Sequence, residues 1–342
     1  MTVLVNVIVT LGMLYVVPAG LRLIDPVGLR RTARLWPLPA ALGAVCLWLP
    51  RGWLATALAA LYAAACLALA VRGCLVGQAG SGSGVWCRGS QGGGGSRRGG
   101  APPSGSWGTS ATDDNAARRG ARHREPGLTD KTPPKAPAAF RRGRPADIAV
   151  ATALASPSIA GTALVAERAG YRLFGFDLDI LALTVPHFHF AGFTAALVAG
   201  LVCRAAAPGP GARWAAYSVP AGTLLVLLGY FVDDWAELAG AVVLTGGMWA
   251  VALATWREIR PAGGDRTTRA LLATSAVVLV ATMLLALWWA TGEATGITHP
   301  TLTWMAATHG LGNALGFALC SVLAWRRLTA AHPQTARQES TP

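Results

Sequence analysis

The chain has 342 residues, of which 53% are hydrophobic and only 13% are charged. An ordinary soluble domain carries about a quarter charged residues, so the composition argues against a water-soluble enzyme and predicts a polytopic membrane protein. The formal net charge of +13 does not indicate nucleic-acid binding, because residues 73–147 hold twelve basic and five acidic residues and the remaining charge lies beside apolar segments.

Apolar segments recur along most of the chain. A hydrocarbon core of about 30 Å takes ~20 helical residues, and backbone polar groups in lipid favour helices. The segments that meet this requirement are residues 3–21, 36–50, 53–71, 148–166, 180–203, 214–232, 236–256, 270–291 and 300–325. The second is the shortest, and prolines bracket it. We therefore expect an all-α integral membrane protein with about nine transmembrane helices.

The segments divide the chain into four regions. Residues 1–72 hold helices 1–3, residues 148–328 hold helices 4–9, and residues 329–342 form a tail. Residues 73–147 are rich in Gly, Arg, Pro and Ser, a composition that cannot bury enough apolar surface to offset chain entropy. We expect this segment to be a disordered cytoplasmic linker. Out-of-frame translation of GC-rich DNA would give the same composition.

Arginines lie in the segments that follow predicted helices 1, 3, 5, 7 and 9. Acidic residues lie before helix 5, between helices 6 and 7, and between helices 8 and 9. Cytoplasmic loops carry an excess of Lys and Arg, so the pattern predicts an external N-terminus and a cytoplasmic C-terminus. Of the 29 basic residues 27 are Arg, a bias typical of GC-rich bacterial coding sequences, so we expect a bacterial cell membrane. The exceptions to the alternation are Arg51, Arg168 and Arg172.

Histidines inside the apolar segments are the main clue to function, because ionisable groups deep in a bilayer are costly and tend to mark a site or a pathway. The run 184–193 contains His187 and His189, which an α-helix would turn about 200° apart. Pro186 can introduce an irregular backbone that brings them closer. One interpretation is a metal, haem or proton-relay site, and the other is that each histidine bonds to a different neighbouring helix.

A second polar group lies in the last apolar segment, where His309 and Asn313 are four residues apart and share one helix face. Gly312 and Gly316 form a GxxxG motif, which more often serves close helix packing than function. His187 and His309 each lie about ten residues, roughly 15 Å, from the predicted outer ends of their helices. The two histidines are therefore expected at one level.

These residues together predict a polar cavity that opens to the extracytoplasmic side. His187, His189, His309 and Asn313 would form its floor. The approach would be lined by His299 and the acidic residues Asp233, Asp234, Glu237 and Glu293. Of these, His187, His189 and His309 are the candidate metal ligands. Solvated loop charges are the alternative interpretation of the acidic residues, with Glu237 the strongest exception.

The sequences PHFHFAGF at 186–193, HP at 299–300 and THGLGNALGF at 308–317 resemble the YndJ-like family of bacterial multispanning membrane proteins. The resemblance covers residues 1–72 and 145–328, and the insert departs from the family pattern. Members are sometimes described as transporters, so the resemblance implies transport.

Two classes of function remain open from the sequence. The first is a secondary transporter or ligand-binding membrane protein that takes a small molecule or an ion. The second is an intramembrane enzyme, either a metal-dependent hydrolase or a lipid-modifying protein, that uses the same histidines as ligands of a divalent metal. A haem-binding membrane protein is a further alternative. The expected partner in each case is the lipid bilayer, not nucleic acid.

Overall fold

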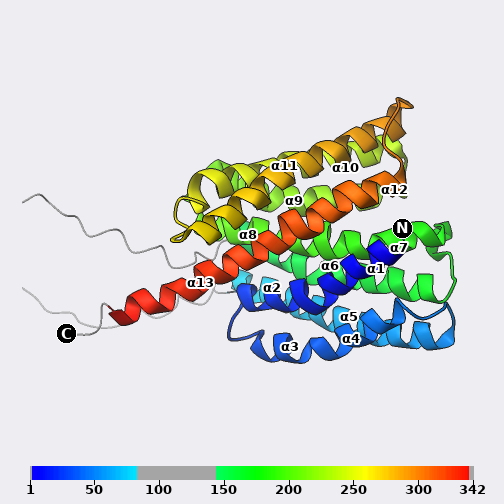
Figure 1. The fold of residues 1–342 in the computed structure, drawn as a ribbon, viewed down its shortest axis with the longest axis horizontal. Coiled ribbons are helices and arrows are strands. Elements are labelled where there is room, and N and C mark those ends of the chain that lie inside the picture. Colours follow the sequence, from blue (N-terminus) through cyan, green and yellow to red (C-terminus); the bar gives the residue numbers. More distant parts are fainter. Residues whose placement is uncertain (1, 83–143, 339–342) are drawn as a thin grey trace, which may run out of the picture. The chain divides into compact units, whose positions relative to one another are not determined.

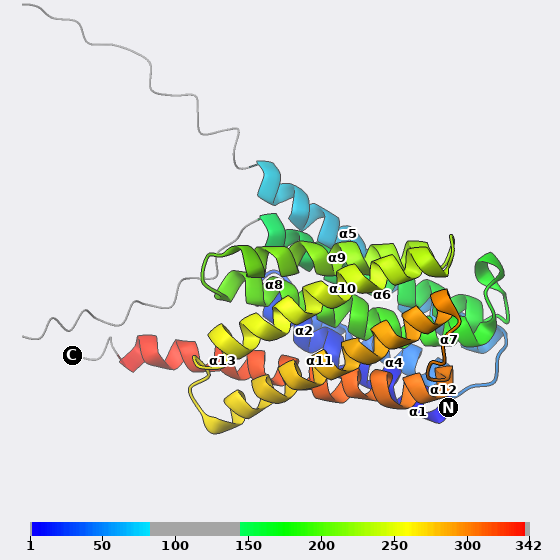
Figure 2. The ribbon, with the colours of Figure 1, turned by 90° about the horizontal axis from the view of Figure 1, so that it is seen from above.

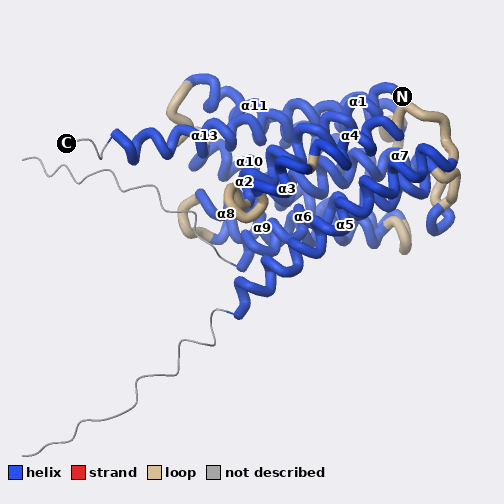
Figure 3. Tube along the Cα trace, turned by 90° about the horizontal axis from the view of Figure 1, so that it is seen from below, coloured by secondary structure: helices blue, strands red, loops and turns tan. Residues whose placement is uncertain are grey.

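The computed structural model describes residues 2–82 and 144–338, with side chains over 2–73 and 144–331. Every regular element in these ranges is a helix, and neither range contains a strand (Figure 3). The all-helical fold expected from the sequence is confirmed. Helix α5 continues to Gly82 and α6 begins at Arg144, and the rest of the linker expected at 73–147 lies outside the described residues.

The helices follow the order of the apolar segments. The first part of the chain forms α1 (Thr2–Leu11), η1 (Gly12–Val16), α2 (Val17–Ile24), α3 (Arg30–Leu35), α4 (Pro37–Cys46) and α5 (Trp53–Gly82). The middle forms α6 (Arg144–Arg168), η2 (Leu173–Gly175), α7 (Leu178–His187), η3 (Phe188–Thr194), α8 (Ala195–Ala205) and α9 (Pro210–Gly229). The last part forms α10 (Asp234–Ala254), η4 (Thr255–Ile259), α11 (Arg266–Thr295), α12 (Leu302–Met305), η5 (Ala306–Gly310), η6 (Gly312–Leu319) and α13 (Cys320–Gln338).

Seven helices in the described ranges are long and apolar enough to cross a membrane. The shorter apolar helix α4 has only ten residues. Helix α9 has 20 residues but includes Arg213 and is less apolar than the seven. The structure thus supports a membrane protein with at least seven candidate spans in its described part, and nine spans remain a prediction.

Two aspartates, Asp233 and Asp265, are the N-caps of helices α10 and α11. Asp233 accepts a hydrogen bond from the backbone N–H of Ala236 at 2.8 Å, and Asp265 accepts one from the N–H of Thr268 at 2.8 Å. Such N-caps satisfy donors that the first helical turn leaves free. The hydrogen bonds from Thr268 lower the pKa of Asp265 below its ordinary value.

Helices α9, α10 and α11 lie side by side (Figures 1 and 2). Glycines allow α9 and α10 to approach closely. A Cβ atom on Gly222 would lie 2.5 Å from the Leu244 backbone, and one on Gly229 would lie 2.4 Å from the Cα atom of Glu237. This close packing fixes the start of α10, and with it Glu237, against the end of α9.

The GxxxG motif of the last membrane segment packs against α11. A Cβ atom on Gly312 would lie 2.8 Å from the methyl group of Thr282, and one on Gly316 would lie 2.7 Å from Val278. Small residues of this kind let two helix backbones come together in a membrane. Here they bring the His309 segment against Thr282.

The loops gather in two sets, one at each end of the bundle. At one end, Arg204 contacts the Ile24 carbonyl and Asp147, and the backbone N–H of Ala207 donates to Glu258 at 2.8 Å. At the other end, residues near 52 and 168 are hydrogen-bonded, and aromatic side chains of the 174–176 and 230–231 loops pack together. Loops of the arginine-rich set expected in the cytoplasm thus contact one another. Which end faces the cytoplasm remains a prediction.

Each of the three arginines that break the charge alternation has an acidic partner. The buried Glu167 carboxylate accepts hydrogen bonds from Arg51 at 2.9 Å and from the Nη2 atom of Arg168 at 2.6 Å. Arg172 pairs with Asp177. Because their charge is compensated locally, these arginines are weak guides to topology.

Candidate functional site

The first histidine motif lies where an α-helix changes to a wider π-helix. Helix α7 ends at His187, and Phe188–Thr194 form η3. Pro186, just before this change, has no backbone N–H to donate. The backbone after this proline is therefore irregular, and π-helical turns are frequent at functional sites.

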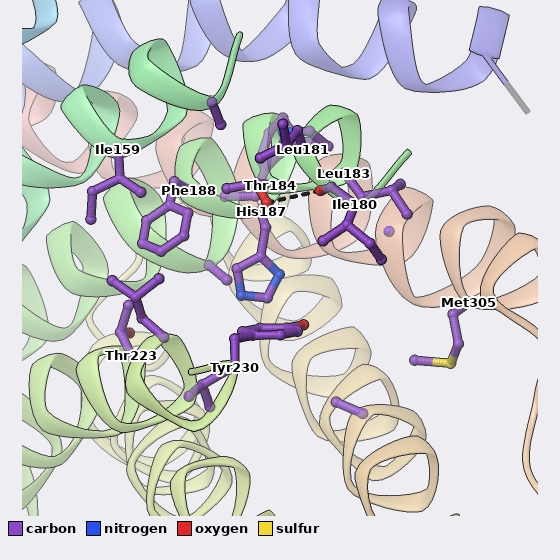
Figure 4. Close-up of a pocket in the computed structure, with 18 of the residues that line it drawn as sticks. Ile159, Ile180, Leu181, Leu183, Thr184, His187, Phe188, Thr223, Tyr230 and Met305 are labelled. Carbon is purple, nitrogen blue, oxygen red and sulfur yellow. Dashed lines mark hydrogen bonds between the residues drawn. The ribbon is translucent and has the colours of Figure 1, made fainter. Parts of the chain in front are cut away.

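His187 points into a cavity between the helices, toward Tyr230 (Figure 4). Its ring packs edge-on against Phe188, with a centroid separation of 5.8 Å. Among the described residues, no group forms a hydrogen bond with this imidazole. A neutral imidazole carries one donor and one acceptor, so both of them remain available to a molecule in the cavity.

His189 lies on the other side of η3 and is fully buried in the protein. Its Nδ1 atom is 2.7 Å from the carbonyl oxygen of Val185, and its Nε2 atom is 2.5 Å from the hydroxyl of Tyr62. Since a carbonyl only accepts, Nδ1 carries the proton, and the Tyr62 hydroxyl donates to Nε2. Both nitrogens are used within the protein, and the residue does not line the cavity.

The second histidine motif forms a closed set of hydrogen bonds with α11. The Nδ1 atom of His309 donates to the carbonyl of Thr282 at 2.7 Å, and the Asn313 amide donates to Nε2 of His309 at 3.0 Å. The Thr282 hydroxyl completes the set by donating to the Asn313 side-chain oxygen at 2.7 Å. These bonds hold His309 as a neutral imidazole at the cavity wall.

Three π-helical segments from distant parts of the sequence contact one another. They are η1 from the first helix, η3 from the first histidine motif and η6 from the second. A Cβ atom on Gly12 of η1 would lie 3.2 Å from the Cβ atom of His189. The two histidine motifs therefore lie on either side of a single junction of irregular helices.

The cavity has a volume of about 530 Å³, within the size range of small-molecule sites. Most of its wall is apolar, formed by Leu, Ile, Val, Ala, Phe and Met side chains of α1, α6, α7, η3, α9, α10, α11 and the last membrane helix. The polar side chains that line it are Ser158, Thr162, Thr184, His187, Thr223, Tyr230, Glu237, His309 and Asn313. Such a wall suits a molecule with a large apolar part and few polar groups.

Aromatic side chains surround the end of the cavity nearest the loops. Phe231 packs edge-on against Phe174 and Phe176, with centroid separations of 5.5 and 5.4 Å, and Phe176 packs against Tyr230 at 6.4 Å. All four line the cavity, and Phe174 is 74% exposed. The cavity therefore reaches the surface at this end of the bundle.

Toward the opposite end, a second cavity of about 20 Å³ continues beyond Asn313. Phe190, Met248 and Phe317 are among its lining residues. This space holds about one water molecule. Bulky apolar side chains thus separate the large cavity from the arginine-rich end.

Glu237 is in the first turn of α10 and is only 7% exposed, yet its side chain lines the cavity. No arginine, lysine or histidine pairs with it among the described residues. The Tyr230 hydroxyl approaches its carboxylate, and the nearby charged groups, Asp234 and Glu293, are acidic as well. A buried carboxylate without a cation is expensive, so this group is a strong candidate for a functional role.

His299 lies in the loop before α12, outside the cavity lining. Its Nε2 atom is 3.2 Å from a Glu293 carboxylate oxygen, and its ring packs edge-on against Trp289. A Cβ atom on Gly292 would lie 2.3 Å from that of His299, so the glycine makes room for the loop. These contacts fasten the loop to the end of α11.

The structure therefore brings His187, His309, Asn313 and Glu237 to one cavity, and places His189 and His299 elsewhere. The proposed metal ligands His187, His189 and His309 do not converge. Within residues 2–82 and 144–338, no three His, Cys, Asp or Glu side chains are arranged to hold a metal ion.

Sequence reasoning missed two hydroxyl partners of the histidines. Tyr62 lies among alanines and leucines in α5, and Thr282 lies in the apolar run of α11. A hydroxyl inside an apolar segment was the available signal, since buried polar groups need partners. The aromatic cavity mouth gave no comparable signal because its residues come from two loops far apart in sequence.

Comparison with known proteins gives one family. A family sequence profile described as YndJ-like protein matches residues 7–79 and 134–317, which is most of the chain. No curated protein and no solved structure matches it.

Proposed function

This chain belongs to the YndJ-like family, and we propose that it is a secondary transporter or ligand-binding membrane protein of the bacterial cell membrane. The ligand would be a small molecule held within the helix bundle. The observation that carries the proposal is the free imidazole of His187 in a cavity of about 530 Å³ (Figure 4). Here His187 supplies a hydrogen bond in a mostly apolar site, which fixes the orientation of the ligand.

The wall of the cavity indicates the general character of the ligand. Leu183, Phe188 and Met305 offer apolar contact, whereas the threonine hydroxyls of Thr184 and Thr223 already donate to carbonyls of their own helices. Only a few polar groups therefore remain free for recognition. A largely apolar molecule with one or two polar atoms matches this wall better than a sugar or a nucleotide.

Transport is supported by the way the cavity ends. It reaches the surface at the aromatic mouth and narrows beyond Asn313 to a space of about 20 Å³. Transporters keep their substrate sites near the middle of the membrane, beside interrupted helices. The junction of η1, η3 and η6 supplies irregular helices at this level, where a small shift would open the second side.

Filling the cavity tests the proposal. We expect the full chain in nanodiscs to bind tritiated triphenylphosphine oxide, a neutral and mostly apolar probe whose oxygen can accept a hydrogen bond from His187. Ala306→Phe should weaken this binding about tenfold or more, equivalent to about 1.4 kcal/mol, because Ala306 lines the cavity. Scintillation proximity measures the binding directly.

Ala307→Phe is the matched control, because Ala307 is exposed on the same helix and does not line the cavity. It adds the same phenyl group one residue away and should leave binding unchanged. Equal binding by both variants, or no binding by the unaltered protein, would contradict a ligand site in this cavity.

A further inference from the structure

The mouth of the cavity is acidic. Acidic side chains outnumber arginines at this end of the bundle, and Arg51, Arg168 and Arg172 are each paired with a carboxylate. No arginine or lysine lines the cavity within the described part of the chain. A negatively charged ligand would meet repulsion there without a compensating cation.

Glu237 differs from the other acidic groups at this end. Glu167 is paired with arginines, Glu293 is paired with His299, and Asp233 caps α10. Glu237 has no such partner among the described residues, although its side chain is more than nine-tenths buried and faces the cavity. Its nearest charged neighbours, Asp234 and Glu293, are acidic, so a cation in the cavity would supply a compensating charge that the described protein does not.

Aromatic side chains line the same cavity as Glu237. Phe174, Phe176, Tyr230, Phe231 and Trp289 line the cavity together with Glu237. The face of an aromatic ring attracts a cation, and these rings also exclude water from the carboxylate. Rings and a buried carboxylate are a combination suited to an organic cation, whose charge is spread over an apolar body.

We propose that the cavity selects small lipophilic cations, with the positive charge placed beside the Glu237 carboxylate, the apolar groups against the apolar wall, and any hydrogen-bonding atom beside His187. This inference rests on the proposed ligand-binding function and names its ligand class. A proton and the organic cation would compete for the one carboxylate, so that cation binding releases a proton when Glu237 is protonated beforehand.

A matched pair of probes tests the charge alone. Methyltriphenylphosphonium and triphenylphosphine oxide have nearly the same shape, but only the first is a cation. In nanodiscs of zwitterionic lipid, which carries no net charge, and after subtraction of the binding to empty nanodiscs, we expect the full chain to bind the cation about tenfold more tightly than the neutral probe. Glu237→Gln should bring the ratio of the two affinities close to one and leave binding of the neutral probe intact.

Asp234→Asn is the control, since it removes an equal charge from an exposed side chain on the same helical turn. It should keep most of the preference for the cation. Equal affinities for the two probes in the unaltered protein would overturn the inference, and so would a preference for the cation that survives Glu237→Gln. In either case, binding of the neutral probe would still support the proposed function. Failure to bind either probe would contradict both.

If Glu237→Gln does not fold, the pH dependence of probe binding by the unaltered protein tests whether Glu237 recognises the cation. The titratable groups near Glu237 are Tyr230, Asp234 and Glu293, and the imidazoles of His187 and His309 line the same cavity. Cation binding should fall as the pH is lowered from about 8 to about 5, because protonation of the buried Glu237 carboxylate removes the negative charge that holds the cation, whereas neutral-probe binding should fall far less. Parallel curves for the two probes would overturn the inference.

Discussion

His187 and His189 are two residues apart in one sequence motif and have opposite surroundings. His189 is fully buried, and both of its ring nitrogens are hydrogen-bonded within the protein, to Val185 and Tyr62. His187 faces the cavity and has no hydrogen-bond partner among the described residues. The comparison shows that two histidines in one membrane helix can differ in whether their ring nitrogens are free to meet a ligand.

The difference follows from helix geometry. Residues two apart point about 200° from each other on an α-helix, and the π-helical turn of η3 does not remove this separation. One face of the segment therefore packs on α5 and η1, while the other borders the cavity. His309 is intermediate, because it lines the cavity but is held by Thr282 and Asn313.

Truncating Tyr62 should have the largest effect on stability. Its ring is fully buried between Trp36 and His189, so Tyr62→Ala leaves a cavity and an unsatisfied imidazole nitrogen. We expect the free energy of unfolding to fall by about 3–5 kcal/mol, the usual range for a buried aromatic residue. Unfolding in mixed micelles of increasing SDS content would measure it.

Tyr62→Phe separates the hydrogen bond from the packing. It keeps the ring and removes only the hydroxyl donor to His189, for which we expect a loss of about 1–3 kcal/mol. A loss as large as that of Tyr62→Ala would mean that the hydroxyl dominates, and no loss in either variant would contradict the structural role given to His189.

The sequence predicted the fold class well, because apolar segments of about 20 residues and the need to satisfy backbone groups leave few alternatives to helices. It also predicted that His187 and His309 lie at one level. Both histidines line the cavity, and their common depth in a membrane stays a prediction. The prediction used the number of residues between each histidine and the end of its helix. This distance depends only on the local helix geometry and not on which helices become neighbours.

The partners of these residues could not be predicted, since they depend on which helices become neighbours. Tyr62 is 127 residues from His189, and Thr282 is 27 residues from His309. Pro186 indicated an irregular backbone near η3, but the wide turns of η1 and η6 left no clear mark in the composition. Whether a buried histidine is satisfied is therefore a property of the tertiary structure, and the sequence grouped His189 and His187 together for this reason.

Asn313→Ala should remove one hydrogen bond from the His309 ring and leave its Nε2 atom free, like the ring nitrogens of His187. The Asn313 amide occupies the Nε2 lone pair of His309, and its removal exposes that nitrogen to the cavity. Diethyl pyrocarbonate attacks an unprotonated imidazole nitrogen, so His187 should react in the unaltered protein, and His309 should react only in the variant. Mass spectrometry of the peptides identifies each modified histidine.

Stability should fall modestly in the same variant, by about 1 kcal/mol, because the Thr282 hydroxyl loses one acceptor but keeps a weaker contact with the Leu279 carbonyl at 3.2 Å. His189 should stay unreactive in both proteins and serves as the internal control. Modification of His189 in the folded protein would break the distinction between the two kinds of histidine.

The smallest effect on stability is expected for His187→Leu, because no hydrogen bond within the described protein depends on this ring. The free energy of unfolding should change by less than about 0.5 kcal/mol, whereas His189→Leu should lose about 1–3 kcal/mol because the Tyr62 hydroxyl is left without its acceptor. Binding of triphenylphosphine oxide should be affected in the opposite way. His187→Leu should lower the affinity about fivefold, equivalent to about 1 kcal/mol for one hydrogen bond, and His189→Leu should lower it less. If His187→Leu instead destabilises the protein and leaves binding unchanged, His187 is a packing residue like His189, and the cavity must recognise its ligand through other groups.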